Sequence, residues 1–231
     1  MKTYAIGDIH GYLKPLQQCL QRCDFDFEND RLICLGDVAN RGPETYECFE
    51  LLLTAKNLIY ILGNHDTWLL DYFNKPKQPI DANWFKYGGR TTLASYKKNN
   101  FKLEKHHQLL SNAHLFYLDE KNRLYVHGGF EMGKFLAKQT ALNFCWDRTV
   151  WYNAVTAEKN IEYQLNSKSP ICSNSIFMGH TCTHRKYADL SPQNFVNVWN
   201  LDQGAGHGYK LSIMEVESFA YWQSDLVSSL Y

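Results

Sequence analysis

The sequence of 231 residues predicts one domain of the α/β (α+β) class, spanning residues 1–231. In its first third, short apolar runs alternate with segments of helical periodicity, which is the pattern of a parallel sheet with helical connections. Residues 194–225 instead alternate between apolar and polar side chains and carry Gly-rich turns, which is typical of antiparallel strands. No internal repeat or low-complexity tract divides the chain, so we expect no second domain.

Five apolar runs, each four to six residues long, end at a Gly near a polar side chain. They are rich in Ile, Leu, Tyr and Val, so we predict that they are buried strands. The Gly lets the chain turn sharply where each strand ends. The polar side chains at these ends are, in chain order, Asp8 and His10, Asp37, Asn64 with His65 and Asp66, His127, and His180.

Helical spacing follows the first three of these runs. Segments 12–23, 43–55 and 67–73 each place apolar side chains three and four positions apart. Because the carboxyl ends of parallel strands meet at one edge of a sheet, we expect the polar strand-end residues to collect there. Residues 74–114 are less regular, with Pro, Gly and many aromatic residues before a helix-like stretch.

The composition argues against several classes of protein. The 24 Lys and Arg balance the 24 Asp and Glu, so neither nucleic acid nor an acidic membrane is an expected partner. No apolar run reaches the roughly 18 residues of a membrane-spanning helix, and no long apolar signal region opens the chain. The odd number and scattered spacing of the cysteines predict reduced thiols in a cytoplasmic protein. They are Cys19, Cys23, Cys34, Cys48, Cys145, Cys172 and Cys182.

The strand-end residues together form a set that suits metal chemistry. One such residue alone would be unremarkable, since an Asp or Asn after Gly is usually a turn residue. Two carboxylates, three imidazoles and one amide suit a pair of divalent ions such as Mn, Fe or Zn. Two ions held about 3.5–4 Å apart can lower the pKa of a bridging water and hold the oxygens of a phosphoryl group. The set is Asp8, His10, Asp37, Asn64, His127 and His180.

The motifs GDIHG, GDVANRG, GNHD, HGG and GH, between Gly7 and His180, also carry a resemblance. In this order they resemble the calcineurin-like metallophosphoesterases, specifically the phosphoprotein phosphatase branch. The resemblance implies a four-layer sandwich of two mixed β-sheets flanked by helices. It also implies that Asp8 and His10 bind the first metal, that Asp37 bridges, and that Asn64, His127 and His180 bind the second.

The same resemblance implies roles in catalysis. A bridging hydroxide attacks phosphorus in line, and His65 as general acid gives the leaving alkoxide its proton. Arg41 grips the phosphate, because its planar fork matches two phosphate oxygens. Arg148 is the second candidate for phosphate binding, in a stretch that resembles the family's Trp-x-Arg element. The alternative for Arg148 is a surface ion pair with Asp147. We expect Asn64 to lie at the phosphate as well.

Asn40 is a departure from the family's pattern. In the protein phosphatases the second motif usually reads GDxxDRG, and the Asp before Arg accepts a hydrogen bond from the catalytic His. The amide oxygen of Asn40 can accept that bond but carries no charge. We therefore predict that His65 is less basic than in those relatives. Asp66, adjacent to His65 in the sequence, is the candidate for supplying part of the missing charge.

The function that the sequence favours is a metal-dependent phosphatase acting on phosphomonoesters, as a serine/threonine protein phosphatase. The substrate would be a phosphorylated protein or a small phosphoester, and Mn is the preferred metal. The alternative is a symmetrical diadenosine tetraphosphate hydrolase, which the non-Asp residue before Arg41 and the stretch LGNHDTWLLDYF resemble. The stretches WFKYGGRTTLASY and LDQGAGHGYKLSIMEV resemble the small bacterial protein phosphatases more. An alternative from a different class of function is a non-catalytic module that binds metal or phosphate.

For the remaining polar and aromatic residues we predict mainly structural or solvent-exposed roles. We predict solvated or capping roles for His106, His107 and His114, and a solvated loop for residues 184–186. His207 is expected near the rim of the site, without a catalytic role. The remaining aromatic residues are expected to be mostly core, with one or two lining a substrate groove. They are Trp84, Phe85, Tyr87, Trp146, Trp151 and Tyr152.

Overall fold

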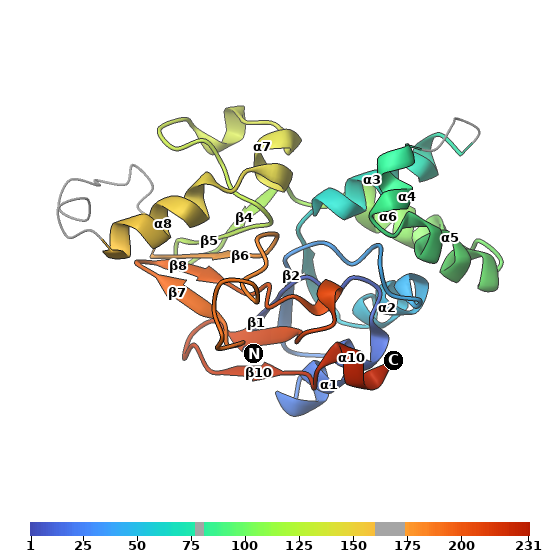
Figure 1. Cartoon of the computed structure of the whole chain (residues 1–231), viewed down its shortest axis with the longest axis horizontal. Helices are drawn as coiled ribbons and strands as arrows, with labels where there is room; N and C mark the ends of the chain where they lie inside the picture. The colour runs from blue at the N-terminus through green and yellow to red at the C-terminus, as the bar shows by residue number, and fades with distance from the viewer. Residues whose placement is uncertain (77–80, 160–173) are drawn as a thin grey trace.

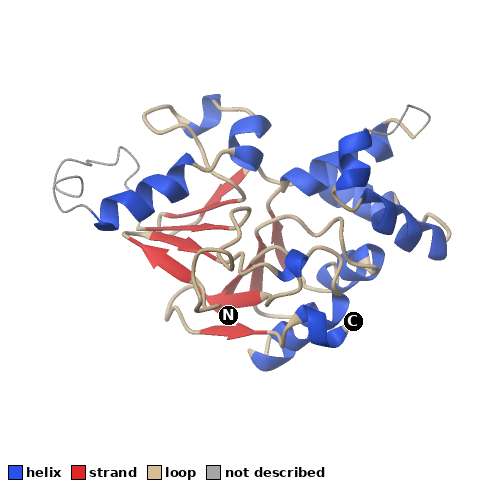
Figure 2. Cartoon of the chain, in the orientation of Figure 1, coloured by secondary structure: helices blue, strands red, loops and turns tan. Residues whose placement is uncertain are grey.

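The computed structural model describes residues 1–76, 81–159 and 174–231, and these form two five-stranded mixed sheets (Figures 1 and 2). The first sheet has the order β10-β9-β1-β2-β3, in which β1, β2 and β3 are parallel. Its strands are β1 Thr3–Ile6, β2 Arg31–Cys34, β3 Asn57–Tyr60, β9 Ser212–Glu215 and β10 Tyr221–Gln223.

The second sheet has the order β4-β5-β6-β8-β7, in which β5, β6 and β8 are parallel and the two edge strands are antiparallel. Its strands are β4 Phe116–Leu118, β5 Arg123–Val126, β6 Ser175–Met178, β7 Gln193–Phe195 and β8 Val198–Asn200. The five runs predicted from the sequence are therefore confirmed as β1, β2, β3, β5 and β6. The predicted C-terminal antiparallel pairs are also confirmed, although β7–β8 and β9–β10 belong to different sheets.

Helices cover the outer face of each sheet, as Figure 2 shows. Those on the side of the first sheet are α1 Leu13–Arg22, α2 Thr45–Leu52, α3 Asn64–Asn74 and α10 Val227–Leu230. Beyond them lie α4 Ala82–Lys86, α5 Gly89–Lys98 and α6 Glu104–Ser111, where α5 packs on α2 and α6 on α3. Those packed against the second are α7 Ala141–Trp146 and α8 Thr149–Lys159. Short 3-10 turns add η1 Leu136–Lys138 and η2 Ala205–His207. Helices after each of the first three strands were predicted, and α1, α2 and α3 confirm them.

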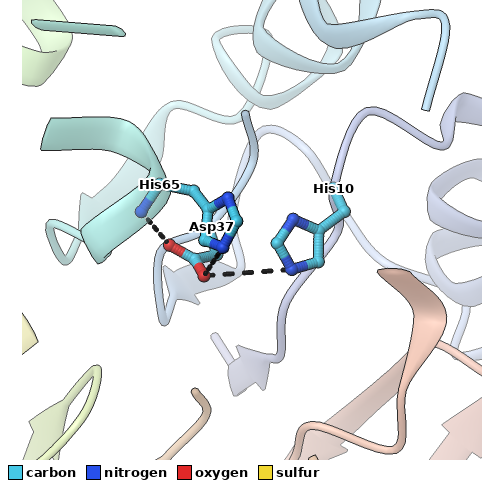
Figure 3. Close-up of side chains that lie close together, drawn as sticks. All are labelled: His10, Asp37 and His65. Atoms are coloured by element: carbon cyan, nitrogen blue, oxygen red, sulfur yellow. Dashed lines mark hydrogen bonds and ion pairs between the residues drawn. The ribbon is translucent and has the colours of Figure 1, made fainter. Parts of the chain in front are cut away.

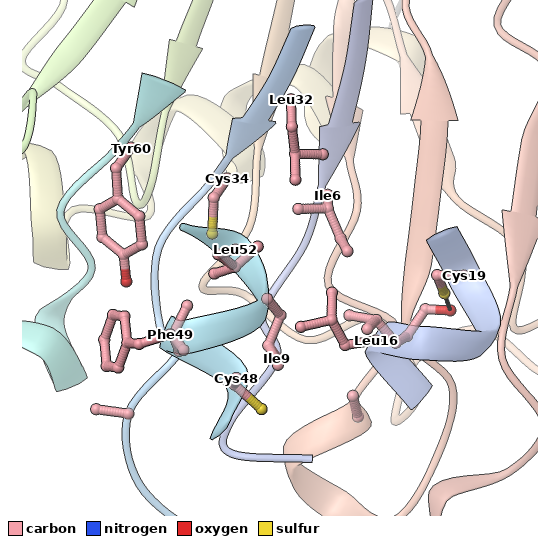
Figure 4. Close-up of a cluster of buried hydrophobic side chains, with 14 of the residues drawn as sticks. Ile6, Ile9, Leu16, Cys19, Leu32, Cys34, Cys48, Phe49, Leu52 and Tyr60 are labelled. Atoms are coloured by element: carbon pink, nitrogen blue, oxygen red, sulfur yellow. Dashed lines mark hydrogen bonds between the residues drawn. The ribbon is translucent and has the colours of Figure 1, made fainter. Parts of the chain in front are cut away.

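Strand alternation explains the four layers. Tyr4 and Ile6 of β1 point into the cluster shared with the helices, which Figure 4 shows in part, whereas Ala5 points the other way. Ala5 meets Tyr125 and Phe177 of the second sheet, whose rings stack at 5.1 Å between centroids. One apolar cluster thus joins the inner faces of the two sheets. The predicted sandwich is confirmed, and its inner layer is consistent with the single domain that we predict.

Two expectations about the chain's surroundings can be compared with the structure. In the described residues six cysteines are free thiols, and Cys172 lies outside those residues. Five of the six are buried, and Cys182 is half-buried. Among the same residues, no helix is both long and apolar enough to cross a membrane.

The predicted solvated role of His106 is wrong. The side chain is 1% exposed, with Nδ1 lying 2.8 Å from the Tyr96 hydroxyl and Nε2 lying 2.8 Å from a Glu50 carboxylate oxygen. The sequence stretch is polar because its other face is solvated, and α6 turns this one imidazole inward. His114 is exposed as predicted, and half-buried His107 bonds to Asn74.

Replacing His106 by Ala is expected to lower the free energy of unfolding by about 1–3 kcal/mol, because the buried Tyr96 hydroxyl loses its partner. Urea denaturation followed by circular dichroism measures this loss. His114→Ala is the matched control and should change stability by less than about 0.5 kcal/mol. Equal effects of the two substitutions would contradict the structural role of His106.

Candidate active site

The strand-end side chains converge on one cavity of about 310 Å³. It opens where the carboxyl ends of parallel strands from both sheets meet, whereas the sequence pattern predicted the edge of one sheet. Among the sequence-predicted residues, its lining includes Asp8, His10, Asp37, Arg41, Asn64, His65, Arg148 and His180. His127 lies behind them, with Nε2 at 3.0 Å from the Asn64 side-chain oxygen. The cavity therefore brings together the predicted metal and phosphate residues.

The loops at this edge hold unusual backbone conformations. Eleven non-Gly residues in the described part of the chain have positive φ, and five of them are predicted site residues. These five are His10 at 53°, Asp37 at 54°, Asn40 at 76°, Arg41 at 71° and His180 at 64°. Such conformations cost on the order of 1–3 kcal/mol each and persist only where surrounding contacts impose them. The site is therefore an over-determined, strained part of the fold.

Asp37 lies at the centre of the side-chain cluster (Figure 3). One carboxylate oxygen lies 3.9 Å from His10 Nε2 and 4.0 Å from His65 Nε2, and the other lies 3.5 Å from His127 Nε2. Two groups of possible ligand atoms, each within 4.8 Å of one another, share this carboxylate: His10 with Asp37 and His65, and Asp37 with His127 and His180. Sharing by both groups is the geometry of a bridging ligand.

Three imidazoles have one ring nitrogen held by a backbone carbonyl. Metal-binding histidines characteristically donate their other N–H in this way, which turns the free lone pair toward the ion. The contacts are His10 Nδ1 to Ala39 at 3.0 Å, His127 Nδ1 to Leu35 at 2.8 Å and His180 Nε2 to Trp146 at 3.3 Å. The remaining nitrogens of His10 and His180 are therefore available as metal ligands, whereas Nε2 of His127 faces the oxygens of Asp37 and Asn64 and would give up its proton on binding a metal.

The charges of the cavity also suit cations. Three carboxylates, those of Asp8, Asp37 and Asp202, are buried together. Burial and the charge of Asp202 raise the pKa of Asp8 well above its usual range, and burial with the charge of Asp37 raises the pKa of Asp202 to about 6. Burial opposes ionisation of Asp37 too, but the charge of His127 holds its pKa well below its usual value. Divalent ions would relieve this repulsion, so the residues present fit the predicted cofactor.

Asn40 contacts the ring of His65 directly, with its side-chain nitrogen 2.6 Å from Nδ1. The orientation of the amide follows from its other neighbours. The Trp84 indole N–H can only donate, and it lies 2.7 Å from the Asn40 side-chain oxygen. The Thr92 hydroxyl reaches the same oxygen at 3.2 Å. The amide therefore donates an N–H to His65, and Nδ1 of His65 accepts it.

This contact separates His65 from the other imidazoles. If Nδ1 accepts a hydrogen bond, the neutral ring carries its proton on Nε2, which faces Asp37 in the cavity. A protonated nitrogen has no lone pair to offer a metal. His65 lies close enough to His10 and Asp37 to be grouped with them, but in this protonation state it is not a metal ligand. Burial lowers the pKa of His65 to about 4, and the charge of Arg41 acts in the same direction. His65 is thus a neutral N–H donor.

Arg41 is aimed into the cavity with unused donors. One terminal nitrogen lies 3.4 Å from the Gly206 carbonyl oxygen, while Nε is buried and has no hydrogen-bond partner in the described residues. A buried unsatisfied guanidinium donor is costly unless a ligand accepts from it. An oxyanion such as a phosphoryl group supplies that acceptor.

Comparison with known proteins decides the family. The family model described as calcineurin-like phosphoesterase matches residues 1–204. The chain belongs to the calcineurin-like phosphoesterase family. The matched segment contains all six predicted metal ligands and both arginines of the cavity.

Two curated bacterial relatives share a shorter stretch. A symmetrical bis(5'-nucleosyl)-tetraphosphatase of Pseudomonas fluorescens strain SBW25 is 49% identical over 71 residues, which are 30% of this chain and 25% of the relative. One of Cellvibrio japonicus is 46% identical over 80 residues, 34% of this chain and 30% of the relative. The match therefore spans less than a third of each relative's length.

A solved structure gives wider but more distant coverage. A cold-active protein-tyrosine phosphatase of a psychrophilic Shewanella species superposes with a TM-score of 0.63, covering 97% of this chain and 80% of its own. At 17% identity this likeness establishes the fold alone. The arrangement of two mixed sheets with outer helices is therefore shared with this solved structure.

Two sequence expectations at this phosphoesterase site need correction. Asn40 was expected to offer its oxygen to His65, but Trp84 and Thr92 occupy that oxygen and the nitrogen faces the ring. Asp66 was expected to supply charge to His65. Its carboxylate instead accepts hydrogen bonds from the backbone N–H groups of residues 37, 38, 39 and 63 and from the Tyr60 hydroxyl. Asp66 therefore shapes the loop that carries Asp37, and its carboxylate is directed to the backbone of that loop instead of to the His65 ring.

The environment of Arg148 favours the phosphate role over the surface ion pair. Arg148 lines the cavity, whereas the Asp147 carboxylate accepts hydrogen bonds from the backbone N–H and hydroxyl of Thr149. Asp147 is therefore engaged in starting α8. Phosphate binding by Arg148 remains a prediction.

The aromatic prediction was only partly right. Trp84 and Trp151 are buried and Phe85 is half-buried, but Tyr87, Trp146 and Tyr152 are 42%, 37% and 50% exposed. Two of these, Tyr87 and Trp146, line the cavity, in agreement with the expected one or two groove residues. His207 also lines the cavity, as expected for a rim residue.

Sequence reasoning missed several cavity residues. Asp202, Trp68 and Cys182 line the cavity without having been considered for the site. Asp202 follows strand β8, but its sequence signal is weak, because no Gly stands directly before it as at Asp8 and Asp37. Trp68 looks like an ordinary core position of an amphipathic helix, so no sequence signal marks it.

Gly206 packs tightly against the site. A Cβ there would lie 2.3 Å from His10 Cδ2 and 2.7 Å from Arg41 Cδ. Gly206→Ala is therefore expected to displace both side chains and lower kcat/KM by about a hundredfold, the effect of a misplacement near 1 Å. Gly133→Ala is the control, because its Cβ would meet no atom within 4 Å although its φ of 84° makes it mildly strained. Steady-state kinetics of the two folded variants would show equal activity if the packing argument were wrong.

Proposed function

We propose that this phosphoesterase hydrolyses a phosphoanhydride bond of a dinucleoside tetraphosphate, releasing two nucleoside diphosphates. The observation that carries the proposal is the hydrogen bond that Asn40 donates to Nδ1 of His65. It leaves His65 neutral, with a pKa lowered to about 4 chiefly by burial. A substrate whose leaving group needs little protonation suits such a site best.

The leaving groups of the candidate substrates differ in this respect. A serine alkoxide is a strong base and leaves only when it receives a proton, for which a protonated imidazole is effective. A nucleoside diphosphate leaves as a phosphate anion whose charge is already spread over several oxygens. Hydrogen bonding from the neutral Nε2–H of His65 is sufficient for it. Water supplies the new oxygen on phosphorus, and the bridging P–O bond breaks.

The chain's other residues have roles consistent with this reaction. Arg41, with its unused buried donor, and Arg148 are positioned to bind the phosphoryl oxygens. Asn64 lies on the same wall. Two divalent ions, held by Asp8, His10, Asp37, Asn64, His127 and His180, would activate the water and neutralise the phosphoryl oxygens. We keep Mn as the preferred metal, with Fe or Zn as alternatives.

The curated relatives support the same substrate, since both are named as symmetrical bis(5'-nucleosyl)-tetraphosphatases. The serine/threonine protein phosphatase that the sequence favoured becomes the second candidate. The sequence stretches around residues 84–96 and 201–216 remain the features in its favour. A cytoplasmic location, inferred from the free thiols, and the absence of a nucleic-acid partner stay predictions.

One assay separates the two candidates. Mn-loaded enzyme is given diadenosine tetraphosphate and, in parallel, phosphoserine, phosphothreonine and phosphotyrosine peptides at matched concentrations. We expect ADP as the nucleotide product and a kcat/KM for the dinucleotide at least about a hundredfold above that for the phosphoserine peptide, the range that general acid catalysis contributes. Faster turnover of the phosphoserine peptide would contradict the proposal and favour the protein phosphatase function.

A further inference from the structure

Three aromatic side chains, from α3, the turn after α4 and α7, meet on one wall of the cavity. Trp68 and Tyr87 lie nearly parallel, with an interplanar angle of 9° and centroids 5.8 Å apart. Trp146 meets Trp68 edge-on at 5.5 Å. We call Trp68, Tyr87 and Trp146 the aromatic wall.

The aromatic wall is continuous with the polar centre of the site. The His65 ring lies edge-on to Trp68 with centroids 5.2 Å apart, and His180 lies edge-on to Trp146 at 6.2 Å. Trp68 is half-buried beneath the other two rings, whereas Tyr87 is 42% exposed and Trp146 is 37% exposed. A ligand bound at the polar centre would therefore meet free ring surface as it extends outward.

The cavity thus has two chemically different ends. Arg41, Arg148 and the buried imidazoles and carboxylates suit a phosphate chain with metal ions, whereas the aromatic wall suits a flat unsaturated ring. Lys86 adds an exposed ammonium 5.7 Å from the Tyr87 centroid, which favours an anionic ligand at this mouth. A phosphate chain joined to an aromatic heterocycle is the chemistry of a nucleotide.

We propose that the aromatic wall is a stacking site for one nucleobase of a nucleoside polyphosphate substrate. The proposal rests on the proposed function for its choice of ring, since a phosphotyrosine ring is the other flat group that could lie there. Stacking on aromatic side chains tolerates any base because every base has a π-face. The aromatic wall would raise the affinity for nucleotides above that for phosphates without a base. Its effect on the reaction would therefore appear in substrate binding.

The test measures binding of a reaction product and of a base-free analogue by calorimetry. The probes are ADP and methylenediphosphonate, added to the Mn-loaded full chain. In the wild type, ADP should bind about tenfold more tightly than methylenediphosphonate, the gain expected from one stacked base. Tyr87→Ala should lose that preference, and Tyr87→Phe should restore it because the ring returns without the hydroxyl.

Tyr152→Ala is the matched control. Tyr152 is also a half-exposed aromatic residue, but it lies on α8 and is not among the residues that line the cavity. This variant should keep the ADP preference of the wild type. Thermal unfolding of each variant checks that it is folded, and Tyr87→Phe keeps the comparison informative if Tyr87→Ala does not fold.

Steady-state kinetics adds a second readout. In Tyr87→Ala the ratio of kcat/KM for diadenosine tetraphosphate to that for inorganic tetraphosphate should fall about tenfold, mainly through KM. Equal affinity of the wild type for ADP and methylenediphosphonate would overturn the proposal. So would a Tyr87→Ala effect confined to phosphotyrosine peptides, which would assign the wall to an aryl phosphate.

The design separates this proposal from the proposed function. If the wild type binds ADP in a Tyr87-dependent way but does not hydrolyse diadenosine tetraphosphate, the stacking site stands and the proposed function fails. If it hydrolyses the dinucleotide but Tyr87→Ala and Tyr152→Ala bind ADP equally, the function stands and the stacking site fails.

Discussion

Asn40→Asp is expected to raise kcat/KM for a phosphoserine peptide, relative to that for diadenosine tetraphosphate, by roughly tenfold to a hundredfold. Asp has nearly the same shape as Asn, so its carboxylate can still accept from Trp84 and Thr92. The oxygen that replaces the amide nitrogen would accept an N–H from Nδ1 of His65 instead of donating to it. The added negative charge raises the pKa of His65 and creates the protonated acid that an alkoxide leaving group needs.

The substitution is also expected to change how turnover depends on pH. With a pKa of about 4, His65 in the wild type is neutral from pH 5 to pH 8, so its titration adds no descending limb there. In Asn40→Asp the protonated form is the active acid, so turnover of the phosphoserine peptide should fall as pH rises through the raised pKa. The pH–rate profiles of the two proteins measure this difference.

Asn40→Ala is the control for the added charge. It removes the hydrogen bond to His65 without supplying a carboxylate, so the profile should gain no new descending limb. A profile of Asn40→Asp that coincides with that of the wild type would refute the account of His65 given above.

Asp37→Asn is expected to abolish turnover of every phosphoester and to remove stabilisation by metal. The carboxylate is shared by both groups of possible ligands, so its loss affects both ions at once. Wild-type protein at a metal concentration of a hundredfold over Kd should gain about 2.7 kcal/mol of stability by mass action. Thermal unfolding with and without Mn, together with metal analysis of the purified protein, measures both parts of the expectation.

The comparison must use the metal-dependent shift in Tm. Stability without metal changes as well, because His127 loses a charged partner at 3.5 Å and the His65 backbone N–H loses a hydrogen bond of 2.8 Å. Asp189→Asn is a suitable control, since that exposed carboxylate accepts hydrogen bonds from Ser191 and lies outside the cavity lining. Retained activity of Asp37→Asn, or an unchanged Mn-dependent shift in its Tm, would contradict the two-metal assignment.

Much of the site was predictable because strand ends are local features. A short apolar run followed by Gly and a polar residue identifies both the strand and the side chain at its end, as at Asp37 and His127. Parallel pairing aligns such ends within each sheet, and the packing of the two sheets then brings Asp37 of the first beside His127 of the second. Asp202 was missed for a different reason, since its strand β8 has a weak apolar pattern and pairs only after the chain has returned to the second sheet.

The environment of individual groups was less predictable. His106 appears polar and solvated in its sequence, but its burial depends on Tyr96 and Glu50, which lie 10 and 56 residues away. Asp66 is adjacent to His65 in the chain, yet the first turn of α3 directs its carboxylate to the loop backbone. Sequence neighbours on a helix point in different directions, so adjacency does not predict contact.

By itself, the sequence determined the candidate metal ligands, the order of the first strands and helices, and the presence of an Asn before Arg41. Only the tertiary structure decided what that Asn does, because Trp84, 44 residues away, takes the amide oxygen and turns the nitrogen to His65. It also assembled the aromatic wall from two helices and a turn that no local pattern connects. The physical reason is that ligand sets follow strand ends, whereas the direction of a hydrogen bond depends on every group packed around it.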